Sequence, residues 1–137
     1  MELLWPYLVY RDASEAIEWL GRAFGFTETL RYTESDGRVS HAELSTPRGA
    51  GLMLGSVAPD EAAEPGSVNS FVVVEVDDVQ AHHDHAIAEG AQVLRPLRDL
   101  PYGVRAYSTR DLDGFRWDFQ QHVADVAPEE WGAVSAG

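Results

Sequence analysis

The chain has 137 residues, of which 45% are hydrophobic and 10% aromatic, which is enough for one globular domain with a hydrophobic core. Its formal net charge of −13 argues against nucleic acid as a partner, because binding nucleic acid requires basic residues that displace counterions. The chain has no cysteine, which excludes disulfides and thiolate chemistry, and no run of about 18 apolar residues, which excludes a transmembrane helix. The first residues lack the basic start of a signal peptide, so we expect a cytoplasmic protein with no membrane partner.

The first half of the chain predicts a strand, a helix and three further strands. Leu3–Tyr10 is the first strand, and the proline within it favours a sheet edge. Asp12, followed three residues later by Glu15, is a variant of the capping box and precedes a helix that ends at Gly25. The apolar side of this helix consists of Ala16, Ile17, Leu20, Ala23 and Phe24. The three strands that follow are expected at Thr27–Thr33, Arg38–Leu44 and Gly51–Gly55.

The second half repeats this pattern after an acidic stretch, Ala58–Asn69, which is rich in Ala, Pro and Gly and is expected to be a linker. Asp78 introduces the second helix as Asp12 introduces the first, an offset of 78 − 12 = 66 residues. On this offset Trp5 matches Phe71, and His41 matches Tyr107. The second set of elements is a strand at Ser70–Val76, a helix at Val79–Glu89, and strands at Gln92–Leu97, Val104–Thr109 and Phe115–His122. The sequence therefore predicts an α+β fold of two tandem βαβββ modules in one domain, with module one at about 3–56, a linker at 57–69, module two at about 70–122 and a tail at 123–137.

Four motifs in this order resemble the vicinal oxygen chelate superfamily, which includes glyoxalases, dioxygenases, and fosfomycin- and bleomycin-resistance proteins. They are PYLVYRDASEAIEWLGRAFGF at Pro6–Phe26, DGRVSHAEL at Asp36–Leu44, VEVDDV at Val74–Val79 and PYGVRAYSTRDLDGFRWDF at Pro101–Phe119. The first and last motifs look most like the bleomycin-resistance-like and PhnB-like branches. The resemblance implies eight strands that curl into a cup with the helices outside, and it implies a homodimer.

The resemblance also implies where a metal would be held, on the first and last strands of each module. Carried over by position, these ligand sites fall on Trp5, on Leu52 or Met53, on Phe71 and on Asp118. Aromatic rings and Leu offer no lone pair to a divalent cation, and Met offers only a soft thioether. A catalytic zinc site usually needs three protein ligands, so we expect no metal and no cofactor.

Alternation along the strands predicts which residues line the cup, because alternate residues of a half-buried strand face opposite sides. Ala42, Leu44, Trp117 and Phe119 suit the apolar side that faces the helices. The predicted ligand-binding residues, on the opposite side, are Trp5, Tyr7, His41, Glu43, Phe71, Val73, Arg105, Tyr107, Arg116 and Asp118. Their aromatic rings suit stacking and attract cations.

A run of histidines in the second helix is the one other cluster with metal-ligand chemistry. His82 and His85 are neighbours at i,i+3. Because this helix is expected on the outside of the fold, we expect a solvated helix face, with metal binding as the alternative.

Three functions are compatible with these residues. The first is a metal-free protein that sequesters an aromatic or cationic antibiotic, such as a bleomycin-type glycopeptide or a quinoxaline-type peptide, for resistance or self-protection. The second is a metal-independent isomerase or lyase with His41, Glu43 or Asp118 as the base. The third is a metabolite sensor. The missing metal ligands, the aromatic cup and the acidic charge favour the first.

Overall fold

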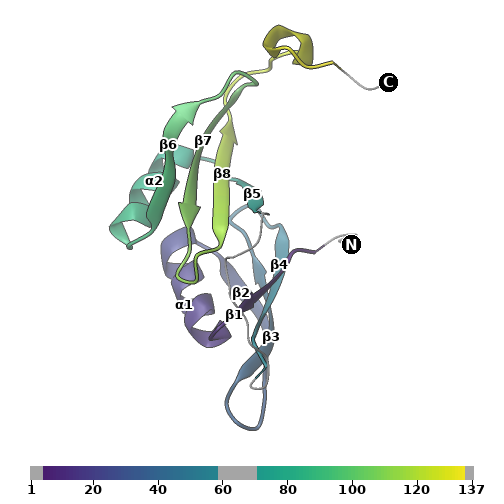
Figure 1. The fold of residues 1–137 in the computed structure, drawn as a ribbon, viewed down its shortest axis with the longest axis vertical. Helices are drawn as coiled ribbons and strands as arrows, with labels where there is room; N and C mark the ends of the chain where they lie inside the picture. Colours follow the sequence, from purple (N-terminus) through teal and green to yellow (C-terminus); the bar gives the residue numbers. More distant parts are fainter. Residues whose placement is uncertain (1–4, 59–70, 135–137) are drawn as a thin grey trace.

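The computed structural model describes residues 5–58 and 71–134 (Figure 1). The first two residues of the expected Leu3–Tyr10 strand, and residues 59–69 of the expected linker, lie outside the described residues. The elements in chain order are β1 (Tyr7–Tyr10), α1 (Ala13–Phe24), β2 (Thr27–Thr33), β3 (Val39–Ser45), β4 (Gly51–Ser56), β5 (Val72–Glu75), α2 (Val79–Ala88), β6 (Gln92–Asp99), β7 (Val104–Arg110), β8 (Arg116–His122) and the short 3₁₀ helix η1 (Pro128–Trp131).

The eight strands form two four-stranded sheets with the same topology. Their strand orders are β1-β4-β3-β2 and β5-β8-β7-β6. In each sheet the first strand pairs in parallel with the last, and the other neighbours are antiparallel. The predicted α+β fold of two βαβββ units is therefore confirmed. Below, the first module is residues 5–56 and the second module is residues 71–122.

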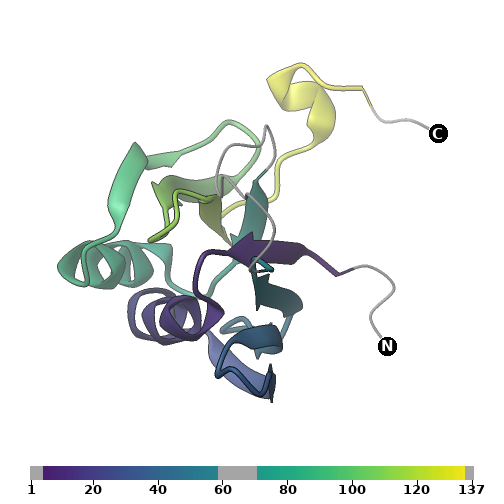
Figure 2. The same ribbon diagram turned by 60° about the horizontal axis from the view of Figure 1, so that its bottom comes forward.

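Local sequence signals set the bounds of the two helices. The Asp12 carboxylate accepts a hydrogen bond from the backbone N–H of Glu15, and the Asp78 carboxylate accepts one from Ala81. Gly25 ends α1 in a left-handed conformation with a φ of 79°. The two helices contact each other on one side of the sheets (Figures 1 and 2). Within the described residues, no helix has the length and apolar content needed to cross a membrane.

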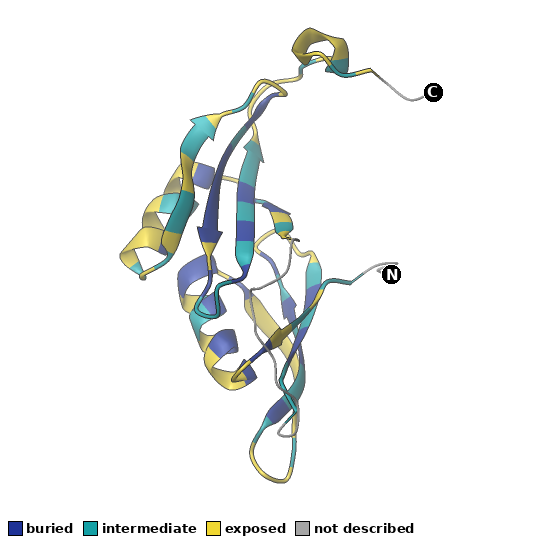
Figure 3. Ribbon diagram, viewed as in Figure 1, coloured by how far each residue is buried: buried dark blue, intermediate teal, exposed yellow. Residues whose placement is uncertain are grey.

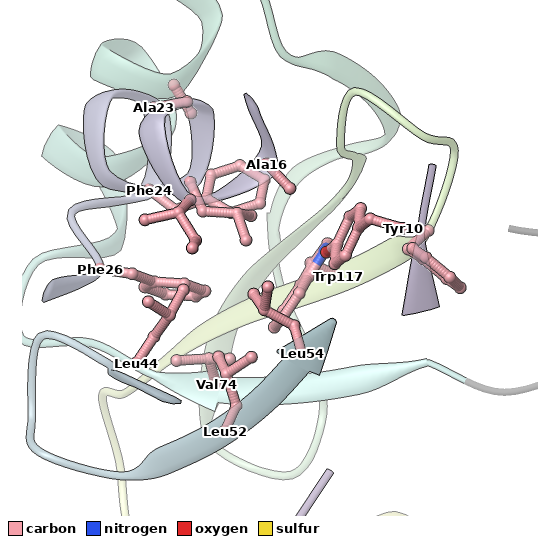
Figure 4. Packing of buried hydrophobic residues seen from close by; sticks show 14 of the residues in the cluster. Tyr10, Ala16, Ala23, Phe24, Phe26, Leu44, Leu52, Leu54, Val74 and Trp117 are labelled. Carbon is pink, nitrogen blue, oxygen red and sulfur yellow. The ribbon is translucent and has the colours of Figure 1, made fainter. Parts of the chain in front are cut away.

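One apolar core joins the two modules between the helices and the sheets (Figure 4). The rings of Phe24 and Phe119 lie 4.8 Å apart between centroids, and those of Phe26 and Trp117 lie 5.3 Å apart. The first residue of each pair belongs to the first module and the second to the second module. Since burying one such side chain contributes roughly 1.5–3 kcal/mol, these contacts fix the position of one sheet relative to the other.

A buried carboxylate adds a polar connection between the modules. Asp111, in the turn between β7 and β8, accepts hydrogen bonds from the Tyr10 hydroxyl at 2.5 Å and from the Trp117 indole N–H at 3.0 Å. Its other oxygen accepts the backbone N–H groups of Asp113 and Phe115, both at 3.0 Å. Burial raises the pKa of the Asp111 carboxyl, while these hydrogen bonds to its charged form act in the opposite direction. Tyr10 therefore ties β1 to the far module through Asp111.

We expect Asp111→Ala to lower the free energy of unfolding by about 3 kcal/mol or more, because it leaves the Tyr10 hydroxyl, the Trp117 indole and two backbone N–H groups without their acceptor. Urea denaturation of the purified variant measures this loss. Asp113→Ala in the same turn is the matched control: Asp113 accepts one exposed hydrogen bond, from the N–H of Arg11 at 2.8 Å, so its loss should cost about 1 kcal/mol. Equal losses for the two variants would contradict the anchoring role of Asp111.

Candidate functional site

The side of each sheet that faces away from the helices carries half-buried and exposed residues (Figure 3), several of which are large and hydrophobic. We call these two surfaces the open faces. The large hydrophobic residues exposed on the strands and just before β5 are Tyr7, Val9, Leu30, Tyr32, Phe71 and Val73. Tyr32 and Leu30 were not among the predicted site residues, although Tyr32 lies opposite His41 and Leu30 opposite Glu43 in the strand register. Their alternation along β2 was the signal that could have identified them.

The expected faces are confirmed for four strands. On β3, Ala42 and Leu44 are buried while His41 and Glu43 are half-exposed, and β1, β5 and β8 alternate in the same sense. On β8 the buried residues are Trp117 and Phe119. The ligand-binding role of the residues on the open faces stays a prediction.

The expectation that Tyr107 faces the open side is wrong. Its side chain is 1% exposed and its ring lies 5.6 Å from Phe119 on the helix side. Burial raises the pKa of the Tyr107 phenol far above its ordinary value. Arg105, two residues before it on the same strand, was assigned to the open face by the same alternation, and that assignment is wrong too. Its guanidinium donates to Asp99 on β6 at 2.7 Å.

A one-residue difference between the modules explains this error. Tyr7 pairs with Met53, and Val73 pairs with Asp118. Glu43 lies opposite Met53, and Ser108 lies opposite Asp118. The offset between equivalent residues of the two modules is therefore 73 − 7 = 66 at β1 and β5, but 108 − 43 = 65 at β3 and β7. A shift of one residue moves every side chain to the other face of a sheet. Tyr107 therefore corresponds to a buried alanine of the first module.

A chain of hydrogen bonds crosses the open face of the first module. The Tyr7 hydroxyl lies 3.2 Å from Nδ1 of His41, and Nε2 of His41 lies 3.1 Å from a carboxylate oxygen of Glu43. The Tyr7 side chain reaches β3 from β1 by passing over Gly55 of β4, where an added Cβ would lie 2.9 Å from the Tyr7 hydroxyl oxygen. Each of the three side chains therefore has a partner that orients it.

The open face of the second module carries an ion pair beside an aromatic ring. Nε and Nη2 of Arg116 donate to the two oxygens of Asp118 at 2.9 and 3.0 Å. These bonds raise the pKa of the Arg116 guanidinium above its ordinary value. The same guanidinium lies 3.9 Å from the centroid of the Phe71 ring, a cation–π contact. Since both oxygens of Asp118 already accept from Arg116, Asp118 is poorly placed to act as a base.

Two grooves lie where the modules meet. One has a volume of about 240 Å³ and brings together predicted residues from both modules; we call it the seam groove. Its lining consists of Pro6, Tyr7, Leu8, Phe71, Val72, Phe115 and Arg116. The second groove, of about 360 Å³, runs between β5 and the end of the β3–β4 hairpin and includes Val73 and Gly51. Trp5 lies directly over Gly51, since a Cβ added to that glycine would clash with the indole ring.

The residues at the carried-over metal positions do not fit a metal. The Trp5 indole lies over Gly51. The Phe71 ring contacts the Arg116 guanidinium, and Asp118 accepts hydrogen bonds from the same arginine. The strand register makes Met53 the counterpart of Asp118. Among residues 5–58 and 71–134, no group of three or more His, Asp or Glu side chains is placed to hold a metal ion.

The expectation of a solvated histidine face on α2 is wrong for His82. Its Nε2 lies 2.9 Å from the backbone oxygen of Phe24 and its Nδ1 lies 2.6 Å from the Tyr107 hydroxyl. The carbonyl oxygen can only accept, so Nε2 donates and, in the neutral ring, Nδ1 accepts from Tyr107. Burial lowers the pKa of the His82 imidazole. His85 donates in the same way to the backbone oxygen of Arg22 at 2.9 Å, so both histidines tie α2 to the end of α1.

The chain is similar in sequence and in fold to known proteins. The family model described as "Glyoxalase/Bleomycin resistance protein/Dioxygenase superfamily" matches residues 3–119. The uncharacterized protein Mb0911c of Mycobacterium bovis is 32% identical over 132 residues, which cover 91% of this chain and 86% of that protein. The crystal structure of TioX from Micromonospora sp. ML1 has a TM-score of 0.71 at 33% identity, and the match covers 92% of this chain and 100% of that chain. The fosfomycin resistance protein FosX from Listeria monocytogenes has a TM-score of 0.66 at 14% identity, with 95% of this chain and 97% of that chain covered, and shows a likeness in fold alone.

Proposed function

Because the chain belongs to the glyoxalase/bleomycin resistance protein/dioxygenase superfamily, we propose that it is a metal-free protein that sequesters an aromatic or cationic small molecule, such as an antibiotic. The observation that carries this proposal is the seam groove, where Tyr7 and Phe71 from the two modules lie on either side of one cavity. Sequestration requires only that the ligand is held. Because a fold of this kind hosts many functions, the groove and not the fold supports this function.

Aromatic surface in and beside the groove supports an aromatic ligand. Tyr7 is 48% exposed and Phe71 is 46% exposed, which leaves ring area free for contact with a second ring. The groove of about 240 Å³ is small for a drug-sized ligand by itself, but two of its lining residues, Tyr7 and Phe71, also belong to the exposed open faces. A larger aromatic molecule would therefore insert one ring in the groove and lay the rest across an open face.

The charge distribution supports a ligand with a positive group. The chain carries a net charge of −13, which raises the local concentration of cations. The one arginine that lines the seam groove is neutralised by Asp118, and Glu43 lies half-buried on the adjoining open face. A cationic group on the ligand would meet a net negative surface on the first module.

A second copy of this chain is the protein partner that we propose. Contiguous exposed apolar surface marks interaction sites in soluble proteins, and the open faces expose Tyr32 at 58% and Val73 at 52%. A homodimer that packs one open face over another would bury these residues and enclose the ligand between the chains.

A metal-independent isomerase or lyase is the second candidate function, favoured by one observation. Glu43 orients His41, as an acid orients the base of a catalytic pair, and the Tyr7 hydroxyl lies on the other ring nitrogen. This candidate predicts a chemically altered ligand, whereas sequestration predicts an unchanged one.

We expect saturable binding near one ligand per subunit or per dimer when the protein is titrated with a panel that includes a bleomycin-type glycopeptide and a quinoxaline-type peptide. Tryptophan fluorescence and calorimetry measure the binding, and mass analysis of the recovered ligand should show it intact. Trp5→Ala should weaken binding by roughly 1–3 kcal/mol if the ligand extends to the second groove, because the indole lies over Gly51 of that groove and offers stacking area.

Tyr102→Ala is the matched control for Trp5→Ala. Tyr102 is an exposed aromatic residue that contacts Trp131 near the C-terminal end, outside both grooves. Affinity should not change in this variant. An altered ligand would favour the enzyme, and no binding to any member of the panel would reject sequestration of this class of molecule.

Sedimentation equilibrium should give twice the mass of one chain for the wild-type protein. Tyr32→Glu should shift the equilibrium toward single chains, because it places a charge on an exposed apolar residue that the dimer would cover. Ile87→Glu, on the exposed side of α2, serves as the control and should leave the mass unchanged. A wild-type protein that stays a single chain at high micromolar concentration would reject the dimer.

A further inference from the structure

The chain of hydrogen bonds through Tyr7, His41 and Glu43 has a direction that its chemistry fixes. An ionised carboxylate can only accept, so Nε2 of His41 donates its hydrogen to Glu43 across the 3.1 Å contact. A neutral imidazole carries one hydrogen, which leaves Nδ1 as an acceptor. The Tyr7 hydroxyl, 3.2 Å from Nδ1, therefore donates its own hydrogen to His41.

The free end of this chain is the oxygen of Tyr7. With its hydrogen committed to His41, the hydroxyl presents only lone pairs to anything that approaches from the open face. Tyr7 is 48% exposed and lines the seam groove together with Phe71. A molecule that stacks on Phe71 would thus meet a hydrogen-bond acceptor at the edge of the same groove.

We infer that Tyr7, His41 and Glu43 form a specificity device that makes the Tyr7 hydroxyl an obligatory acceptor, so that the groove selects aromatic ligands that carry an N–H donor, an aromatic ammonium above all. This inference rests on the proposed binding function and goes beyond it by naming the chemical feature that the site selects. The half-buried Glu43 carboxylate adds a negative charge at the far end of the chain, which favours a donor that is also a cation.

The other polar side chain of the groove does not impose the opposite preference. Two N–H groups of Arg116, on Nε and Nη2, are committed to Asp118, and the guanidinium lies against the ring of Phe71. The positive charge of Arg116 is therefore neutralised by the adjacent Asp118 carboxylate. The group that distinguishes donors from non-donors is the Tyr7 hydroxyl.

Two cationic probes with the same ring separate the donor from the charge. The first is 1-naphthylmethylammonium, which has three N–H donors; the second is its N,N,N-trimethyl derivative, which has none. Titration calorimetry with the wild-type protein should show the ammonium binding about tenfold more tightly. In Tyr7→Phe the ratio of the two dissociation constants should fall by about the same factor, because the acceptor is gone while the ring remains.

Tyr102→Phe is the matched control, since Tyr102 is an exposed tyrosine that contacts Trp131 and lies outside the seam groove and the chain of hydrogen bonds. The ratio of the two dissociation constants should stay at its wild-type value in this variant. In Glu43→Gln the ratio should drop, because an amide donates as readily as it accepts and no longer fixes the direction of the chain.

The outcomes separate the failure of this inference from the failure of the proposed function. Equal affinities for the two probes in the wild-type protein, or a preference that survives Tyr7→Phe, would overturn the inference while the binding function stands. No binding of either probe would overturn both. Nitrogen-15 NMR of the His41 imidazole gives a readout that needs no ligand: the hydrogen should be on Nε2, and a hydrogen on Nδ1 would overturn the inference.

Discussion

The buried carboxylate of Asp111 holds the two modules in the arrangement on which the site depends. It accepts hydrogen bonds from Tyr10 of the first module and from Trp117 of the second, and Trp117 is in turn packed against Phe26. A buried charge of this kind is tolerated only when its acceptor capacity is filled, so the position of β1 is strongly specified. Because Tyr7 lies three residues before Tyr10 on that strand, the same anchor places Tyr7 beside Phe71.

At the site, residues that occupy equivalent positions in the two modules have different chemical roles. Trp5 and Phe71 are equivalent residues, yet Trp5 covers a glycine while Phe71 carries an arginine. Met53 and Asp118 are equivalent in the strand register, yet one is a thioether and the other is an ion-paired acid. Of the four positions that could form a symmetric ligand set, two therefore supply aromatic rings and one supplies an acid that is paired with Arg116. This suits holding an aromatic molecule better than activating one.

The sequence predicted the elements and most of the faces because these follow from local signals. Asp12 and Asp78 marked the helix starts, and alternation placed His41 and Phe71 on the open faces. Tyr107 was misplaced because its face depends on one residue fewer between β5 and β7, a difference that a single offset along the chain does not reveal. The sequence placed His82 in the second helix and Asp111 between the last two strands. Their roles between the modules arise from distant partners, which no local pattern contains. His82 contacts Phe24, 58 residues away in the sequence, and Asp111 contacts Tyr10, 101 residues away.

The proposed binding site for an aromatic cation is the seam between the two modules. The most direct measurement is the mapping of backbone amide chemical shifts in nitrogen-15-labelled protein during titration with 1-naphthylmethylammonium. The largest changes should fall on the amides of Tyr7, Phe71 and Arg116, with saturation at a defined stoichiometry. Largest changes on the outer surface of α2 or in η1, or shifts that grow without saturation, would contradict it.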